Sequence, residues 1–389
     1  MRYKTETLVV CFIKKRKEFN MKISRKKILS FVLSISMLLA CSPIALAADT
    51  GASAISQDQY VDYANNILLD FAELPDVSLP TSGLSLSQPM KVENSVDDAG
   101  YVFFLFDQDT CIGELVVSHD GNDFCSSFLH QDMPAVSTAY KDSEPIYLAT
   151  ISEALLICTE ASTEIIAGNV FEADQDKAIE QLQFSDTNTL PKREKLTLTP
   201  VDMTSKSTYD RAPSSPHSLP VPLVKNESVD GVGICWAAST ASMIQYRTNG
   251  GVRLTAKNVY DTVANNSGYK PGSNDSVRFA LSYYGLTEYR DMTTGMDFAS
   301  VEQQIDAKYP IYMAISGTGN SINKNYYHAV VLCGYGIENN GTGFYEIMDP
   351  NVHDSTIWFT VNVRTGVFTY ASPYSITFRN WYRTVYYPL

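Results

Sequence analysis

The sequence predicts an α+β protein built in two parts, and three observations lead to this fold class. Residues 54–71 carry apolar side chains at helical spacing. Residues 88–158 then change to short apolar runs separated by turn residues. From residue 220 onward helical patterns come first again and strand patterns follow. Segregated helices and strands, rather than alternating ones, are typical of α+β folds.

Composition agrees with a folded, acidic protein. The 389 residues suffice for two ordinary domains, and 44% are hydrophobic while 19% are charged. The formal net charge is −13, and residues 1–47 hold ten Lys or Arg against two Glu. The rest of the chain therefore carries twenty basic and forty-one acidic residues, a net charge of −21. This charge argues against nucleic acid and anionic membrane surfaces as partners.

Residues 1–47 have the pattern of a secretory signal region. A basic stretch begins at Met21, where we expect the true start, and thirteen apolar residues follow from Ile28 to Ala40. Ala45-Leu46-Ala47 forms a small-x-small cleavage site, and thirteen apolar residues are too few to span a bilayer. We therefore expect a secreted, extracellular protein. The alternative is a lipid anchor at Cys41 on the cell surface, because Leu38-Leu39-Ala40-Cys41 resembles a lipoprotein cleavage box.

Cysteine usage also fits export. An odd number of cysteines lies outside residues 1–47, which leaves at least one free thiol in an exported protein. These five are Cys111, Cys125, Cys158, Cys235 and Cys333. One pair among the first three could form a disulfide, or all three could be small buried residues. The sequence has no CxxC pair and no HExxH motif, so we expect neither a metal nor another cofactor.

Residues 48–184 form the first predicted domain, a small α+β unit without a catalytic constellation. Its helix covers residues 54–71, with Ser56 or Asp58 as the cap. Its clearest strands are predicted at residues 101–106, 112–117 and 154–158.

Residues 185–219 form a predicted linker, because Ser, Thr, Pro and Asp dominate and no apolar period is visible. The linker contains the basic patch Lys192-Arg193-Glu194-Lys195. Two interpretations of this patch remain open. It is either an ordinary solvated segment or the site of an activating proteolytic cut.

Residues 220–389 form the second predicted domain. Its first helix begins at Cys235 and runs to about Arg247, where Asn249-Gly250-Gly251 ends it. Further helices are predicted at residues 255–264, 275–284 and 297–309. Strands are predicted at residues 311–315, 328–333, 343–348, 357–363 and 368–370.

Three residues of this second domain could carry out nucleophilic catalysis together. Cys235 opens a helix, whose dipole and free N–H groups favour the thiolate form of the side chain. His328 begins one strand and Asp349 follows the next, so an antiparallel hairpin should make them neighbours. A thiolate, an imidazole and a group that orients the imidazole are the set a thiol hydrolase needs. Asn351 is the alternative third member. Each residue alone would be ordinary structure, and only the combination points to catalysis.

The residues around this set resemble bacterial papain-like cysteine proteases, near the staphopain and streptopain group. The resemblance rests on Cys235-Trp236-Ala237-Ala238-Ser239, His328-Ala329-Val330-Val331-Leu332, Met348-Asp349-Pro350 and Pro310-Ile311-Tyr312-Met313-Ala314-Ile315. It implies a papain-like fold, with an active cleft between a helical lobe and an antiparallel sheet lobe. It also implies a secreted monomeric endopeptidase that acts on peptides or proteins. The enzyme would be made as a zymogen, with residues 48 to about 210 as a pro-domain that inhibits it intramolecularly.

The chain departs from that family at the oxyanion hole. Family members usually have a Gln a few residues before the Cys, whereas Val224-Lys225-Asn226-Glu227-Ser228 stands there in this sequence. Asn226 is the best available donor, and Glu227 could donate only if protonated. The backbone N–H of Cys235 would be the second donor. The third catalytic member is Asp349 instead of the commoner Asn.

Three other functions compete with a general endopeptidase. One is a narrow peptidase such as the double-glycine leader peptidases, although the signal region counts against it. Another is a transglutaminase-type thiol acyltransferase, which also uses Cys, His and Asp. The third is a secreted binding protein that kept the fold but is catalytically weak or inactive, and the missing Gln is its best support.

Overall fold

In the computed structural model of this chain, residues Ile55–Leu389 form one compact unit. The predicted signal region, with Met21 and Cys41, lies outside the described residues. In the part of the chain that is described, no helix has the length and apolar character needed to cross a membrane. The structure describes residues 55–74, 77–93, 100–119, 123–151, 154–159, 163–168, 193–203, 214–318, 325–337, 342–352, 355–371 and 377–389.

Helices and strands in these ranges give a mixed fold with a large antiparallel sheet. The six helices are α2 (Gln57–Ala72), α3 (Pro134–Lys141), α5 (Cys235–Arg247), α6 (Ala256–Asn266), α7 (Asn274–Tyr283) and α8 (Phe298–Asp306). The strands of the first half are β1 (Leu84–Ser87), β2 (Val92–Glu93), β3 (Tyr101–Asp107), β4 (Thr110–His119), β5 (Phe124–His130), β6 (Tyr147–Ile151), β7 (Ala154–Cys158), β8 (Thr163–Gly168) and β9 (Leu198–Pro200). The strands of the second half are β10 (Ser214–Ser218), β11 (Ser228–Val229), β12 (Val232–Gly233), β13 (Arg290–Met292), β14 (Ile311–Thr318), β15 (Asn325–Ile337), β16 (Thr342–Met348), β17 (Ile357–Asn362), β18 (Tyr370–Ala371) and β19 (Thr377–Tyr386).

The first predicted helix is confirmed as α2, and its start follows from local chemistry. Ser56 caps the helix and forms a capping box with Gln59, which satisfies two backbone donors of the first turn. The apolar residues at helical spacing are buried, and they are Tyr60, Ala64, Ile67, Leu68 and Phe71. This buried stripe packs α2 against β4 and β5.

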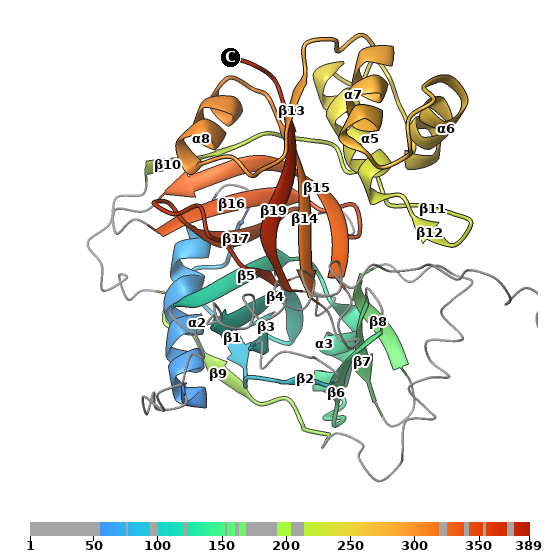
Figure 1. The fold of residues 1–389 in the computed structure, drawn as a ribbon. Helices are drawn as coiled ribbons and strands as arrows, with labels where there is room; N and C mark the ends of the chain where they lie inside the picture. The colour runs from blue at the N-terminus through green and yellow to red at the C-terminus, as the bar shows by residue number, and fades with distance from the viewer. Residues whose placement is uncertain are drawn as a thin grey trace, which may run out of the picture. The chain divides into compact units, whose positions relative to one another are not determined.

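Strands from both predicted domains belong to one sheet (Figure 1). Its order is β13-β19-β14-β15-β16-β17-β5-β4-β3-β1-β9, with β10 paired to β15 and β18 paired to β19. Strands β5 and β17 are the place where the two parts join. A separate four-stranded sheet, β2-β6-β7-β8, belongs to the first part. Two clusters of buried apolar side chains fill the unit, and α2 lies in the smaller one.

Part of the predicted linker is also paired into this sheet. Residues 198–200 form β9, which pairs with β1 at one end of the sheet, and residues 214–218 form β10, which pairs with β15. These segments are polar and lack an apolar period, so their sequences gave no strand signal. The backbone of β1 and β15 supplies the hydrogen-bond partners instead, and such pairing needs no particular side chains.

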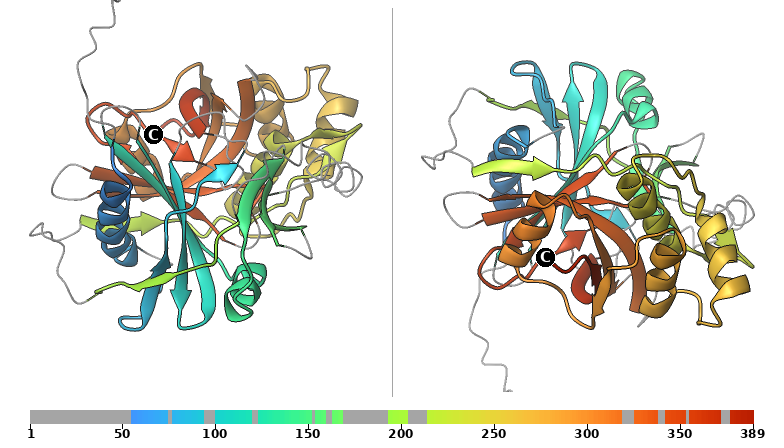
Figure 2. Two further views of the ribbon diagram at one scale, coloured as in Figure 1. Left: turned by 90° about the horizontal axis from the view of Figure 1, so that it is seen from below. Right: turned by 90° about the horizontal axis from the view of Figure 1, so that it is seen from above.

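Three helices of the second part form one group beside the sheet, whereas α8 packs separately against β10 and β15. Helices α5, α6 and α7 pack on one another, and α5 also contacts β14 and β15 (Figure 2). All four helices predicted in this part are present, with ends that differ by a few residues from the predicted ones. Helix α5 is buried over most of its length because it is built from small and apolar residues, which lets the neighbouring elements approach closely.

The strands of the second part extend from a central strand, β14. It pairs with β15 on one side and with β19 on the other. Strands β15 and β16 form the predicted antiparallel hairpin, with Val331 opposite Met348. The sequence gave no prediction for β19, although its pairing with β14 covers nearly the whole length of both strands.

Candidate active site

Cys235 occupies the first turn of α5. The residue before it, Ile234, caps the helix without a side-chain hydrogen bond, so the positive end of the helix dipole faces the cysteine. One turn further on, the Ser239 hydroxyl donates to the Ala329 carbonyl at 2.9 Å. Since Ala329 directly follows His328, this bond fixes the start of α5 beside the strand that carries the histidine. The Cys235 side chain is partly exposed.

His328 lies on β15 with its ring almost completely buried. Its Nε2 atom is 2.8 Å from Oδ1 of Asp349. The ring also packs at a tilt against Phe378, with 5.7 Å between centroids. Because Nε2 is engaged by the carboxylate, Nδ1 is the ring nitrogen left for Cys235. The structure therefore brings together the three residues that the sequence singled out.

Asp349 is fully buried and its carboxylate has three hydrogen-bond donors. His328 and the backbone N–H of Asn351 both contact Oδ1, each at 2.8 Å. The Tyr370 hydroxyl donates to Oδ2 at 2.9 Å. Of the two candidates for the third position, it is thus Asp349 whose side chain touches the imidazole. Such a set of donors satisfies the buried carboxylate oxygens and fixes their orientation.

The surroundings of His328 favour its charged form. Burial by itself would lower the pKa of His328, but the Asp349 carboxylate and a hydrogen bond with Cys235 outweigh it. The pKa of His328 is therefore raised well above its usual value. A protonated imidazole next to a thiol favours the thiolate, which is the nucleophilic form. His328 and Cys235 can therefore form an imidazolium–thiolate pair at the N-terminus of α5.

Asn226 lies close to these residues because of a small hairpin. Strands β11 and β12 pair, and Ile234 N–H donates to the Glu227 carbonyl at 2.9 Å, so Asn226 and Cys235 flank the open end of this hairpin. Asn226 is buried, and its backbone N–H donates to the Pro350 carbonyl at 2.8 Å. Its side-chain amide donates to Oδ1 of Asn351 at 2.8 Å. The amide is thus oriented by the loop that follows the third residue of the set.

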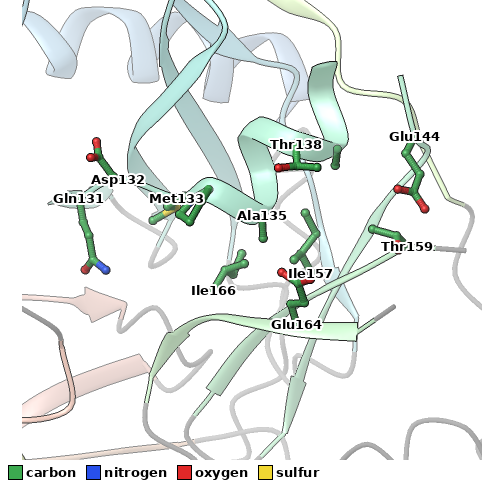
Figure 3. Close-up of a pocket in the computed structure, with 12 residues that line it drawn as sticks. Gln131, Asp132, Met133, Ala135, Thr138, Glu144, Ile157, Thr159, Glu164 and Ile166 are labelled. Atoms are coloured by element: carbon green, nitrogen blue, oxygen red, sulfur yellow. The ribbon is translucent and has the colours of Figure 1, made fainter. Parts of the chain in front are cut away.

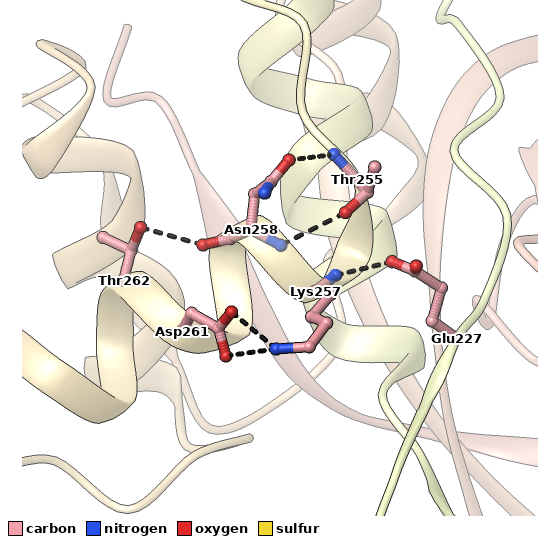
Figure 4. A network of polar contacts seen from close by, with 6 residues as sticks. All are labelled: Glu227, Thr255, Lys257, Asn258, Asp261 and Thr262. Atoms are coloured by element: carbon pink, nitrogen blue, oxygen red, sulfur yellow. Dashed lines mark hydrogen bonds and ion pairs between the residues drawn. The ribbon is translucent and has the colours of Figure 1, made fainter.

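Glu227, the other side chain considered for the oxyanion hole, is tied to a neighbouring helix (Figure 4). Its carboxylate accepts a hydrogen bond from the backbone N–H of Lys257 at 2.6 Å. Lys257 lies in the first turn of α6, whose start is already held by a capping box between Thr255 and Asn258. A carboxylate at this place interacts favourably with the helix dipole. Glu227 therefore acts as an accessory cap of α6.

Sequence reasoning missed Phe378, which packs on the His328 ring, and several tyrosines. Tyr370 holds Asp349 from β18. Burial and the nearby Cys235 both raise the pKa values of Tyr312 and Tyr382, with burial the larger cause. Tyr327, which is 63% exposed, contacts the Tyr382 ring edge-on at 5.5 Å. The abundance of tyrosine in this half was the available signal, but their positions depend on tertiary structure.

The remaining cysteines differ from Cys235 in their environment. None of the five described cysteines forms a disulfide, so Cys111, Cys125 and Cys158 are not joined to one another in this part of the chain. Burial raises the pKa values of Cys111 and Cys158, which keeps both thiols protonated. Cys333 is also buried, and its thiol donates to the Glu346 carbonyl at 3.5 Å. Among the described residues, no group of three or more His, Cys, Asp or Glu could hold a metal ion.

A pocket of about 380 Å³ lies elsewhere, between α3 and strands β7 and β8 (Figure 3). Its floor is apolar, with Met133, Ile157 and Ile166, and acidic side chains such as Asp132 and Glu164 line it as well. It contains none of the three residues of the candidate site and no nucleophile.

Comparison with known proteins found a family model that is similar to the second part of the chain. Residues 218–372 match the model of the Peptidase C39-like family, and this stretch contains all three residues of the site. The match supports a cysteine peptidase-like family and fits a papain-like fold. It does not support the staphopain and streptopain group in particular, so the resemblance stated above holds only at the coarser level. No curated protein matches the chain.

Proposed function

We propose that this protein is a secreted cysteine endopeptidase with a Cys235–His328–Asp349 triad. The observation that carries the proposal is the site geometry: a cysteine at a helix start, in contact with a buried histidine that a fully buried aspartate holds. The family match, which covers the same residues, supports the reaction class. Secretion is proposed from the basic, apolar and small-residue pattern of residues 21–47.

The reaction follows from the roles of these groups. The Cys235 thiolate attacks the carbonyl carbon of the scissile peptide bond, and the resulting oxyanion accepts hydrogen bonds from the Asn226 amide and the Cys235 N–H. The His328 imidazolium gives its proton to the leaving amine, and an acyl-enzyme remains. Neutral His328 then takes a proton from water, which attacks the thioester and releases the carboxylic acid. Asp349 holds the ring in one tautomer during both steps.

We propose further that the enzyme is made as a zymogen. In this scheme residues 48–184 act as an intramolecular inhibitor until the segment around Arg193 is cut. The basic patch supports this location, since Arg193 and its neighbours suit many proteases. Two contacts limit the access of a protease to the peptide bond after Arg193. The Glu194 backbone pairs with Ile146, and the Arg193 guanidinium lies 5.8 Å from the Tyr147 ring centroid.

The decisive experiment compares residues 48–389 with a Cys235→Ala variant. Both proteins are incubated with casein and with an epoxide-type thiol inhibitor, and the masses of protein and substrate are followed. We expect casein cleavage, self-cleavage and one inhibitor adduct in the parent protein, and none of them in the variant. A Cys125→Ala variant serves as the matched control, because Cys125 is a partly exposed thiol outside the site.

Other outcomes would identify the competing functions. Incorporation of a labelled amine into casein without cleavage would indicate an acyltransferase. Absence of both adduct and cleavage, even after deliberate cutting near Arg193, would contradict the enzyme proposal and leave a binding protein.

A further inference from the structure

The two parts of the Ile55–Leu389 unit are joined first by main-chain pairing. Strand β5 of the first part pairs with β17 of the second, with Leu129 opposite Ile357 and Ser127 opposite Phe359. The ladder is extended by the Ser126 N–H, which donates to the Thr360 hydroxyl at 3.1 Å across 234 residues of sequence. Without β5, strand β17 would be an open edge with unpaired backbone groups.

Aromatic side chains cover one face of this junction. The Phe71 ring of α2 packs against Phe128 of the first part at 5.3 Å and against Phe344 of the second at 5.4 Å. Phe344 and Trp358, both from the second part, are at most 1% exposed and belong to the cluster that α2 covers. Leu74, just after α2, approaches Gly336 so closely that a Cβ there would lie 3.2 Å from its methyl group. Removing the first part would expose these large apolar surfaces to water.

A second set of contacts links the first part to the residues around Asp349, and it runs through β18. Strand β18 contacts both β4 and β5. The Tyr370 ring on β18 stacks with Phe359 at 5.4 Å, and Phe359 is itself paired with Ser127 of β5. Because the Tyr370 hydroxyl holds Asp349, the first part of the chain supports the residue that orients His328.

The segment after the basic patch, residues 194–200, forms further hydrogen bonds with the first part. Glu194 and Ile146 exchange two backbone hydrogen bonds, of 2.8 and 2.9 Å. The Gln88 side chain bonds to the backbone of Lys195 and Thr197, and β9 then pairs with β1. A cut before Glu194 would leave Glu194, Lys195, Thr197 and β9 on the C-terminal fragment, and Ile146, Gln88 and β1 on the N-terminal one. The two fragments would still be paired between β5 and β17 and between β1 and β9.

We propose that the N-terminal part, residues 55–168, is a lasting component of the functional protein rather than a segment that leaves after cleavage. Its partner is the C-terminal part of the same chain, and any cut in the connecting segment acts as a nick that yields a two-chain assembly. A large apolar contact combined with a shared sheet distinguishes this junction from the mobile interfaces between ordinary domains. The inference does not require hydrolytic activity, although it alters the zymogen scheme proposed above.

The test places the recognition sequence of a site-specific protease over residues 204–213, which connect β9 to β10. The full chain is purified as the Cys235→Ala variant, so that self-digestion does not interfere, and it is then cut completely. We expect both fragments to elute together in native gel filtration, at the volume of the uncut protein. A second nicked protein with Phe71→Ala should separate at a lower urea concentration, whereas one with the exposed Asp62→Ala should behave like the parent.

The same cut in the Cys235-containing protein reports on the site. We expect the nicked protein to react with the thiol inhibitor at a rate within about twofold of the uncut protein. Two fragments that separate under native conditions, with the C-terminal fragment folded and still reactive, would overturn the proposal. Aggregation upon cutting would contradict it too, since the assembly must survive the nick. If no inhibitor reacts with either cut or uncut protein while the fragments co-elute, the proposed enzymatic function fails and this inference stands.

Discussion

Asp349 differs from the asparagine commonly found at the third position of related thiol proteases, and the difference is electrostatic. A carboxylate carries a full negative charge next to His328, whereas an amide carries none. The buried position leaves little water to screen this charge, so its effect on the imidazole is strong. Asp349 therefore both orients the ring and extends the pH range over which the ring stays protonated.

This charge leads to a prediction for the Asp349→Asn variant. The pKa of His328 is raised by Asp349, so removing the charge should lower it and shift the alkaline limb of the kcat/KM profile to lower pH. The same pairing stabilises the fold at pH values below about 6.5, and that contribution is lost as the pH rises through the raised pKa of His328. Peptide hydrolysis from pH 5 to 10 measures the shift. The exposed Asp261→Asn variant should keep the parent profile, and an unchanged limb in Asp349→Asn would contradict the assignment.

Asn226 provides a second prediction at this scale. If its amide stabilises the oxyanion, Asn226→Ala should lower kcat by about 10²–10³-fold while KM changes little. Asn351→Ala is the matched control, because it removes the hydrogen-bond partner of the Asn226 amide but keeps the amide itself. Equal losses in both variants, measured by steady-state kinetics, would show that Asn226 only positions the loop.

The residues of the site could be predicted from sequence to the extent that their neighbours in the chain identify them. Cys235 and His328 stand within short runs whose residue types are informative by themselves. Asp349 followed from the expected hairpin of β15 and β16, because antiparallel pairing makes such ends meet. Tyr370 had no such signal, since its contact with Asp349 arises only after β18 has joined the sheet.

The hairpin formed by β11 and β12 is the element that sets the distance between Asn226 and Cys235. Asp230 and Gly231 at its tip both have positive φ angles, 53° and 75°. An Asp-Gly pair of this kind is typical of a tight two-residue hairpin turn. The hairpin therefore reverses the chain between Asn226 and Cys235, so that Asn226 lies near the start of α5.

Glu227, at the base of this hairpin, gives a prediction for α6. Glu227→Ala removes a carboxylate from the helix N-terminus and should lower the free energy of unfolding by about 1 kcal/mol. Because Glu227 is bonded to Lys257 and not to the triad, kcat should remain unchanged. Urea denaturation and peptide hydrolysis measure the two effects. Asp261→Ala, which breaks an exposed ion pair on the same helix, should cost less than about 0.5 kcal/mol. A large loss of kcat in Glu227→Ala would contradict this role and assign Glu227 to the oxyanion hole instead.

Helices were predicted better than strands at this scale. The caps and apolar stripes of α2, α6 and α8 are local features, and each of these helices appears close to its predicted position. Strand β19 escaped prediction because charged and aromatic residues are mixed along it, as in Arg379 and Trp381. Its strand character comes from pairing with β14, a tertiary contact that no local pattern records.

The shared sheet implies that the Ile55–Leu389 unit unfolds as one body. Phe71→Ala should lower the free energy of unfolding by about 3–5 kcal/mol, because its ring fills a site between Phe128 and Phe344. We expect calorimetry to show one transition, shifted as a whole to lower temperature. Asp62→Ala on the exposed side of α2 should change stability by less than about 0.5 kcal/mol. Two transitions, only one of them shifted, would show that the two parts unfold independently.

The union of the two parts could not be inferred from sequence. A strand edge has no signature for its partner, and the Ser126 to Thr360 bond joins residues 234 positions apart. Composition indicated two domains because the polar stretch around residues 185–219 divides two apolar regions. Within the described part of this stretch, residues 198–200 and 214–218 pair with strands of the sheet.

The position of β19 in the sheet also determines when the sheet can be completed during synthesis of the chain. Residues 377–386 follow every other strand in the sequence, yet they lie between β13 and β14 in space. Until they emerge from the ribosome, β14 has one open edge and His328 lacks the packing of Phe378. A partly synthesised chain therefore has a candidate site in which the His328 ring lacks this aromatic support.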